Sequence, residues 1–154
     1  MTLTFRPAVP GDAELLVRLY NAAFYADYLR YGQCPGYGRS VPDMLGSIQR
    51  THKQLLLLDG EPVGVLSYNY EGEGQIYLGC LCVVPEHQGK GLGTRAFARL
   101  LSLCPDWQRI RLITPADKTE NVRFYTEKCG MTPGAVTKDG AVDVVELTRT
   151  RPRQ

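Results

Sequence analysis

The feature that most constrains the fold of this 154-residue chain is a glycine-rich segment between an expected strand and an expected helix. Gly89, Gly91 and Gly93 fall within five residues, after the apolar run Gln75–Val84 and before a helical pattern. Glycine lets backbone N–H groups converge without obstruction from Cβ, and a helix N-terminus adds a partial positive charge. The segment is therefore predicted to bind a phosphate group.

The spacing of these glycines separates the segment from two better-known phosphate loops. A Walker loop requires Gly-x-x-x-x-Gly-Lys-Ser/Thr, and the segment has no such match. A dinucleotide fingerprint requires Gly-x-Gly-x-x-Gly within a βαβ unit, whereas the spacing here is Gly-x-Gly-x-Gly after strands that meander. The remaining alternative is a glycine-rich connector that binds nothing.

The hydrophobic pattern predicts a mixed α/β fold around this segment. Strands are expected at Thr2–Arg6, Gln54–Leu58, Pro62–Tyr70, Gln75–Val84, Arg109–Thr114, Thr132–Val136 and Val142–Arg149. Helices are expected after an N-cap at Asp12, at Val41–Thr51, from Leu92 to Leu103, and from a capping box of Asp117 and Glu120 to Gly130. This order predicts one domain, residues 1–154, with a central, mostly antiparallel sheet and helices on both faces.

Composition excludes several classes of function. The formal net charge of +2 is too small for a nucleic-acid-binding surface. No apolar run approaches the ~18 residues that cross a bilayer, and the N-terminus has no signal-peptide core, so no membrane partner is expected. Five irregularly spaced cysteines indicate buried thiols rather than a metal site, and a cytoplasmic location follows by default.

The segment resembles the GCN5-related N-acetyltransferase (GNAT) superfamily. Its hallmark, Gln/Arg-x-x-Gly-x-Gly/Ala after a strand that ends in Val-x-Pro, is matched by Gln88, Gly91 and Gly93 behind Val83 and Pro85. The resemblance covers nearly the whole chain and implies the family's fold and acetyl-CoA as co-substrate. It also implies that backbone groups of the turn hold the CoA pyrophosphate, while the preceding strand pairs with the pantetheine arm. The implied CoA-binding residues are Leu81, Cys82, Val83, Gln88, Gly89, Lys90, Gly91, Leu92, Gly93 and Thr94.

A second block, Asn121–Met131, resembles the family's late helix. Tyr125 matches the tyrosine that protonates the departing CoA thiolate in many relatives, although it could instead only pack in the core. The asparagine that often contacts CoA seven residues earlier is replaced by Lys118. Asn121, one turn later, is the candidate substitute.

The catalytic base is not evident from the sequence. Many relatives carry a glutamate at one of two positions on the central strand, and this chain has Tyr77 and Gly79 there. Tyr77 could still relay a proton through water. The remaining carboxylates are Glu71, Glu73 and Asp117, each of which could simply be a solvated turn or cap residue. The cysteines of this strand are not expected to act as nucleophiles, because no histidine or lysine is evident nearby.

The resemblance implies an N-acetyltransferase that joins acetyl-CoA to a small-molecule or peptidyl amine by direct attack in a ternary complex. The alternative is a CoA-binding module without catalysis. The acceptor wall is expected where four tyrosines gather, at Tyr25, Tyr28, Tyr31 and Tyr37, though these could equally be ordinary packing. A homodimer is a further expectation.

Overall fold

The computed structural model describes residues 1–153, and its strands form one seven-stranded sheet in the order β1-β2-β3-β4-β5-β7-β6. The strands are β1 (Leu3–Pro7), β2 (His52–Leu58), β3 (Glu61–Gly72), β4 (Gln75–Val83), β5 (Arg109–Pro115), β6 (Thr132–Asp139) and β7 (Val142–Thr150). The helices are α1 (Ala13–Tyr31), α2 (Val41–Arg50), α3 (Leu92–Leu103) and α4 (Thr119–Arg123). The mixed α/β class predicted from the pattern is confirmed.

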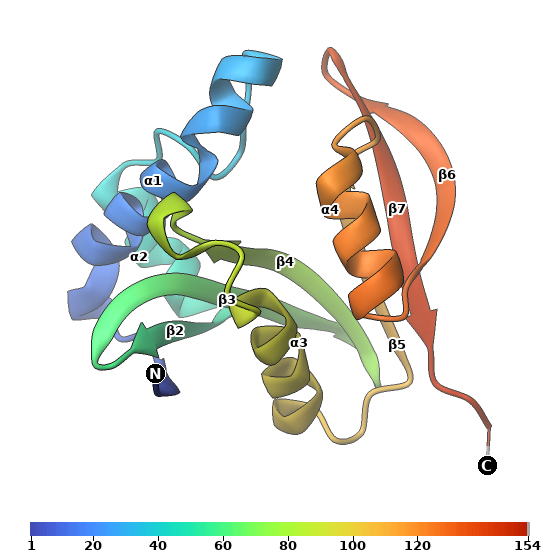
Figure 1. The fold of residues 1–154 in the computed structure, drawn as a ribbon, viewed down its shortest axis with the longest axis horizontal. Helices are drawn as coiled ribbons and strands as arrows, with labels where there is room; N and C mark the ends of the chain where they lie inside the picture. The colour runs from blue at the N-terminus through green and yellow to red at the C-terminus, as the bar shows by residue number, and fades with distance from the viewer. Residues whose placement is uncertain (154) are drawn as a thin grey trace. The chain divides into compact units, whose positions relative to one another are not determined.

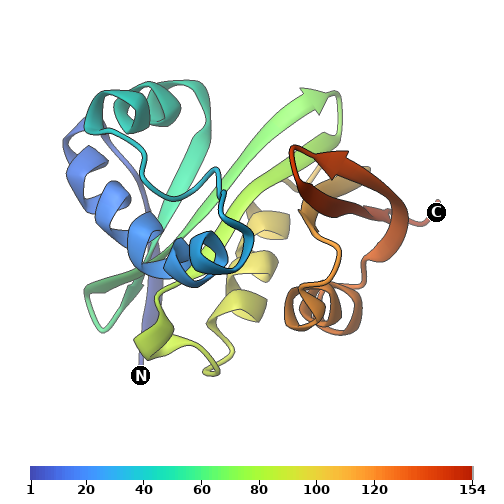
Figure 2. The same cartoon turned by 90° about the horizontal axis from the view of Figure 1, so that it is seen from above.

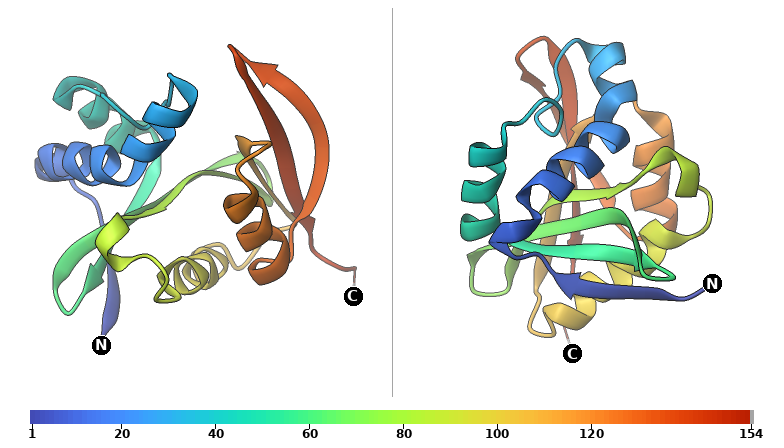
Figure 3. Two further views of the ribbon diagram at one scale, coloured as in Figure 1. Left: turned by 45° about the horizontal axis from the view of Figure 1, so that its top comes forward. Right: turned by 90° about the vertical axis from the view of Figure 1, so that its left-hand side faces the viewer.

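The chain divides into two compact units, and the first contains Met1–Tyr68 and Cys80–Ala96. Within it, β1, β2 and β3 pair antiparallel, and α1 and α2 lie over one face of these strands (Figures 1 and 3). Apolar side chains from helix and strand close this face, with Leu16, Met44 and Leu55 fully buried. The Asp59-Gly60 turn joins β2 to β3, with both residues at positive φ.

The second unit contains Asn69–Gly79 and the chain from Phe97 onward. Here β5 pairs antiparallel with β7, and β7 with β6, which forms a long ribbon beside α4 (Figures 1 and 2). Strand β4 enters this unit parallel to β5. Helix α4 continues directly into a π-helical turn, Phe124–Lys128, and the segment ends at Gly130 with a left-handed backbone.

Of the two predicted helix caps, one is confirmed in position and one is wrong. Asp12 occupies the N-cap position of α1, but its side chain makes no hydrogen bond to the helix; its carboxylate accepts hydrogen bonds from the Arg6 guanidinium at 2.8 and 2.9 Å and from the Val9 N–H at 2.8 Å. The capping box at Asp117 is wrong, because the N-cap of α4 is Lys118 and no side chain caps this helix.

Helix α1 is longer than the pattern predicted. The apolar spacing loosens after Ala23 because Tyr25, Tyr28 and Leu29 lie on the outer side, with 51%, 41% and 63% of their surface exposed. The helix nevertheless continues to Tyr31 and is closed by Gly32, whose φ of 70° suits a helix C-terminus. Because these exposed residues break the helical spacing of apolar positions, the pattern did not predict the last turns of the helix.

No helix among the described residues is long and apolar enough to span a membrane.

Candidate active site

The glycine turn predicted to bind phosphate is open in the structure. After β4, a single 3-10 turn, Pro85–His87, leads to Gly89 and Gly91, whose φ angles are 78° and 77°. No protein atom lies within 4 Å of where a Cβ would stand at either glycine. The backbone hydrogen bonds of α3 begin with Arg95 N–H to Gly91 O at 3.2 Å, so the first N–H groups of the helix need another acceptor. The turn and helix start together form a cradle suited to an anion.

Two side chains of the turn have defined partners. The Gln88 amide donates a hydrogen bond to the Val83 carbonyl at 2.9 Å, which fixes the chain where it leaves β4. The Lys90 ammonium lies 3.0 Å from Nδ1 of His87, and both lysine and turn are exposed to solvent. Gln88 thus shapes the turn, while Lys90 adds a positive charge beside it.

Strand β4 leaves most of one edge unpaired with its parallel neighbour. The ladder to β5 consists of three pairs, from Gln75↔Arg109 to Tyr77↔Arg111, and reaches no further along the described strands. Beyond Tyr77, the backbone groups that face away from β3 are therefore available to an extended ligand. On the β3 side the fit is tight, since a Cβ at Gly64 would collide with the carbonyl oxygen of Cys82.

The three predicted pantetheine-facing residues lie in this part of β4. Leu81 and Val83 are half-buried, whereas Cys82 is buried with 7% of its surface exposed. The Cys82 thiol hydrogen-bonds with Cys80, so its side chain already has a partner within the protein. Only the backbone of Cys82 is therefore suited to the predicted role.

The predicted acid, Tyr125, lies in the second unit, in the π-helical turn after α4. Its side chain is buried, with 5% exposed, and its ring meets that of Phe124 edge-on at 4.9 Å between centroids. The Met131 N–H donates to its carbonyl at 3.0 Å and holds the turn closed. In the same unit, the Asn121 amide donates to the Thr114 hydroxyl at 2.9 Å, which ties α4 to the end of β5.

Of the three candidate carboxylates, Glu71 is held by a cation. Glu71 forms a two-point ion pair with Arg111, at 2.7 and 2.6 Å, and hydrogen bonding by that guanidinium lowers the pKa of Glu71. The same guanidinium lies over the Tyr77 ring, 4.5 Å from its centroid. Glu73 is exposed in the turn between β3 and β4, and Asp117 in the turn before α4 is exposed as well. Glu71 in particular is a weak proton acceptor.

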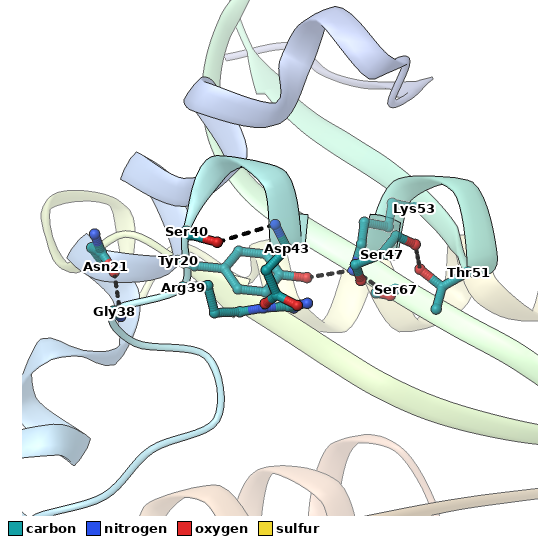
Figure 4. A network of polar contacts seen from close by, with 10 residues as sticks. All are labelled: Tyr20, Asn21, Gly38, Arg39, Ser40, Asp43, Ser47, Thr51, Lys53 and Ser67. Atoms are coloured by element: carbon teal, nitrogen blue, oxygen red, sulfur yellow. Dashed lines mark hydrogen bonds and ion pairs between the residues drawn. The ribbon is translucent and has the colours of Figure 1, made fainter. Parts of the chain in front are cut away.

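The structure brings together polar residues that sequence reasoning missed (Figure 4). The Lys53 ammonium on β2 donates to the Tyr20 hydroxyl of α1 at 2.8 Å and to the Ser67 hydroxyl of β3 at 3.0 Å. Tyr20 in turn hydrogen-bonds with the Cys80 thiol of β4. The expectation that no lysine lies near this thiol is therefore wrong. The available signal was a lysine immediately before the expected strand Gln54–Leu58, but its partners are distant in sequence.

Ionisation in this cluster departs from ordinary values. Burial lowers the pKa of Lys53 to about 8. Hydrogen bonds from Cys82 and Tyr20, together with the charges of Lys53 and Arg39, lower the pKa of Cys80 against the opposing effect of burial. The pKa of Cys82 is raised by its hydrogen bond with Cys80 and by burial. The pKa values of the two neighbouring thiols therefore shift in opposite directions.

Three of the four predicted acceptor tyrosines form an aromatic cluster in the first unit. The Tyr28 and Tyr37 rings stack with centroids 4.5 Å apart, and Tyr25 lies 5.8 Å from Tyr37. Tyr31 is not in these ring pairs; the Arg30 guanidinium lies over its ring at 5.1 Å. Because Tyr25 and Tyr28 are exposed, the cluster presents ring surface that can stack with a planar or cationic group.

A family profile decides the relationship of this chain to known proteins. The profile of the acetyltransferase (GNAT) family matches residues 16–131, about three quarters of the sequence. The chain belongs to this family. As a GNAT acetyltransferase it is an enzyme, and the matched region includes most of α1, the glycine turn and Tyr125. No curated protein sequence matches closely enough to count as a relative.

Solved GNAT structures share the fold at low sequence identity. An acetyltransferase from Thermus thermophilus superposes with a TM-score of 0.78 at 23% identity, covering 98% of each chain. YncA from Salmonella typhimurium, solved with acetyl-CoA, gives 0.77 at 17% identity and covers 100% of this chain and 96% of its own. The PaiA N-acetyltransferase from Thermoplasma acidophilum, solved with coenzyme A, gives 0.78 at 17% identity, with coverage of 95% and 98%. These likenesses confirm the fold.

Proposed function

We propose that this GNAT enzyme transfers an acetyl group from acetyl-CoA to a primary amine. The observation that carries the proposal is the open turn at the start of α3. Gly89 and Gly91 have positive φ and no Cβ, so the space beside the first N–H groups of the helix is open to a ligand. A pyrophosphate fits this cradle by charge and by hydrogen-bonding capacity. Acetyl-CoA is the bound molecule in the structure of YncA, which supports the choice of ligand.

The remaining parts of CoA would lie along β4. Backbone groups of Leu81–Val83 would pair with the amides of the pantetheine arm, because this edge is not used by β5 beyond Tyr77. The turn residues Gln88–Thr94 would surround the pyrophosphate, and Lys90 would add a charge-assisted contact worth roughly 1.5–3 kcal/mol. Asn121 is the weaker candidate contact, since its amide N–H is engaged by Thr114.

The reaction is a direct attack within a ternary complex. The neutral amine adds to the thioester carbonyl, the C–S bond breaks, and the CoA thiolate leaves. Tyr125 donates the proton that the thiolate takes up, and the burial of this residue suits a step from which water is excluded. The acceptor is a small-molecule or peptidyl amine that contacts the cluster of Tyr25, Tyr28 and Tyr37. Five free cysteines favour a reducing compartment such as the cytoplasm.

Replacing Gly91 by valine tests the turn. We expect the variant to lose CoA-dependent thermal stabilisation, because a β-branched residue is strained at φ 77° and its side chain enters the space meant for phosphate. Gly38→Val is the matched control, since Gly38 has φ 76° and equally open surroundings. An unchanged CoA dissociation constant in Gly91→Val would remove the basis for the assignment.

A second candidate function is a CoA-binding module without catalysis. The observation in its favour is that the two β4 positions where relatives carry a glutamate hold Tyr77 and Gly79. A thiol-release assay with a panel of primary amines separates the two functions. The enzyme releases CoA in proportion to the amine added, whereas the module binds CoA and releases none above background.

A further inference from the structure

A pocket lies in the second unit, where the end of the helical segment that follows β5 stands beside the C-terminal end of β7 (Figure 1). Its volume is about 640 Å³, within the range of pockets that hold small organic ligands. The polar side chains among its lining residues are those of Lys128, Thr132, Thr148, Arg149 and Thr150. None of these residues belongs to the proposed CoA site, so the pocket needs an explanation of its own.

The pocket is found where β6 has not yet joined β7. The first pair of the ladder between these strands is Thr132↔Thr148, and Thr150 lies beyond it without a partner in β6. The helical segment ends two residues before Thr132, at Gly130, where φ is 68°. The chain therefore reaches β6 from one side and leaves the end of β7 uncovered.

Lys128 brings an unpaired positive charge to the pocket. Its side chain is exposed, and it forms no hydrogen bond or ion pair with another described residue. The adjacent carboxylate, that of Glu127, is paired with Arg123 at 3.3 Å. No acidic residue is among the described residues that line the pocket. The charge of Lys128 is therefore not neutralised by the pocket itself.

Arg149 adds a second cation, which is fixed in place by neutral groups. Its guanidinium donates to the Cys129 carbonyl at 3.2 Å and lies over the Trp107 ring, 5.2 Å from the centroid. The Arg151 guanidinium lies over the same ring, also at 5.2 Å, and donates to the Pro105 carbonyl at 2.8 Å. Neither arginine forms an ion pair within the described part of the chain. This end of the second unit thus holds several positive charges that lack a counter-charge there.

Three hydroxyls complete the set of donors. Those of Thr132, Thr148 and Thr150 have no side-chain hydrogen bond with any described residue, so each can donate to a ligand. Together with an ammonium and a guanidinium, they offer separate donors around one cavity. A flat carboxylate has two oxygens to accept them, whereas a phosphate group has three strongly accepting oxygens and more negative charge. Phosphate is therefore the better match.

We propose that this pocket binds the phosphate group of a small molecule, as a second anion site of the protein. The glycine turn belongs to the first unit and the pocket to the second, so the two sites use different parts of the chain. The pocket is large enough to hold part of the molecule that carries the phosphate as well. This inference does not depend on acetyl transfer.

The fluorescence of Trp107 tests the site. Trp107 is the only tryptophan of the chain and lies against Arg149, so its emission should respond to a ligand at this wall of the pocket. Inorganic phosphate is the probe, added at constant ionic strength to the complete protein saturated with CoA. We expect a saturable change in emission, with the same dissociation constant by calorimetry. The change should persist in Gly91→Val, because the glycine turn is not the site.

Substitutions in the pocket should weaken phosphate binding selectively. We expect Lys128→Met to raise the dissociation constant about tenfold, because a charge-assisted hydrogen bond is lost. Thr150→Val, which keeps the side-chain shape and removes only the hydroxyl, should raise it a few-fold. Lys138→Met is the matched control: it removes the same charge from an exposed lysine of β6 that pairs with Asp143 at 2.8 Å, and it should change nothing.

Four results would overturn the inference. They are the absence of a saturable signal by both fluorescence and calorimetry, loss of the signal in Gly91→Val, an equal weakening in Lys128→Met and Lys138→Met, and malonate binding as tightly as phosphate. The second would place the phosphate at the glycine turn, the third would indicate diffuse attraction by surface charge, and the fourth would indicate a carboxylate site. A protein that acetylates no amine but meets the expectations above would contradict the proposed function and leave this site standing.

Discussion

At the scale of single residues, some positions of the site can be predicted from the sequence and others cannot. Gly89, Gly91 and Tyr125 occur in local motifs, so their neighbours along the chain identify them. Lys53 and Cys80 are 27 residues apart and become neighbours only through strand pairing and a covering helix. Single-sequence patterns carry no register, so this cluster could not be predicted.

Tyr125→Phe tests the proposed acid. Removing only the hydroxyl preserves the ring packing against Phe124, so the variant should fold and bind acetyl-CoA within a few-fold of wild type. We expect kcat to fall by about 100-fold, because proton donation to the leaving thiolate is lost. Tyr68→Phe is a matched control, since Tyr68 is similarly buried, at 8% against 5% exposed, and outside the proposed machinery. Full turnover in Tyr125→Phe would show that Tyr125 only packs.

At the scale of elements, strands and hairpins followed from the sequence more closely than helix ends. The Asp59-Gly60 and Asp139-Gly140 turns stand between strands that the pattern predicted, and only a few residue types tolerate the positive φ found at Asp59, Gly60 and Gly140. Asp12 stands at the N-cap of α1 as predicted, but its carboxylate accepts hydrogen bonds from Arg6 and Val9 instead of from the helix, and the local pattern does not show these partners. The π-helical turn that contains Tyr125 could not be predicted from the spacing of apolar residues.

The junction of β1 and α1 should be sensitive to acid through Asp12. Hydrogen bonding by Arg6 lowers the pKa of Asp12 in the folded protein, so its stabilising effect is fully present above the unfolded value of about 3.9. The effect is lost as pH falls through the lower, folded value. We expect Asp12→Asn to reduce the free energy of unfolding by about 1–2 kcal/mol at neutral pH, from lost hydrogen bonds.

Urea denaturation of wild type and Asp12→Asn at several pH values measures this effect. The difference between the two proteins should narrow below about pH 4, where the wild-type carboxylate becomes protonated. The exposed pair Arg123–Glu127 offers a control, because Glu127→Gln on the surface should change stability little. A difference that stays constant with pH would mean that charge at Asp12 does not contribute.

At the scale of the whole molecule, the two compact units share three elements. Strands β3 and β4 and helix α3 each run from one unit into the other. We therefore propose that residues 1–154 act as one domain, since three elements contribute residues to both units. The sequence predicted one domain from the order of its expected elements.

Kinetics of the complete enzyme test the order of events. Direct attack requires both substrates to be bound together, so initial rates with acetyl-CoA and amine both varied should give intersecting double-reciprocal lines. Parallel lines, accompanied by an acetylated protein in the absence of amine, would indicate a covalent route.

The three-pair ladder between β4 and β5 predicts how ligand binding changes amide hydrogen exchange. Amides that point to the open edge of β4 beyond Tyr77 have no strand partner there to slow their exchange with deuterated solvent. A bound pantetheine arm would supply that partner, because its amides would pair with this edge in the way that a further strand does. Protection should then appear along this one edge, while the opposite edge, already packed against β3, exchanges at an unchanged rate.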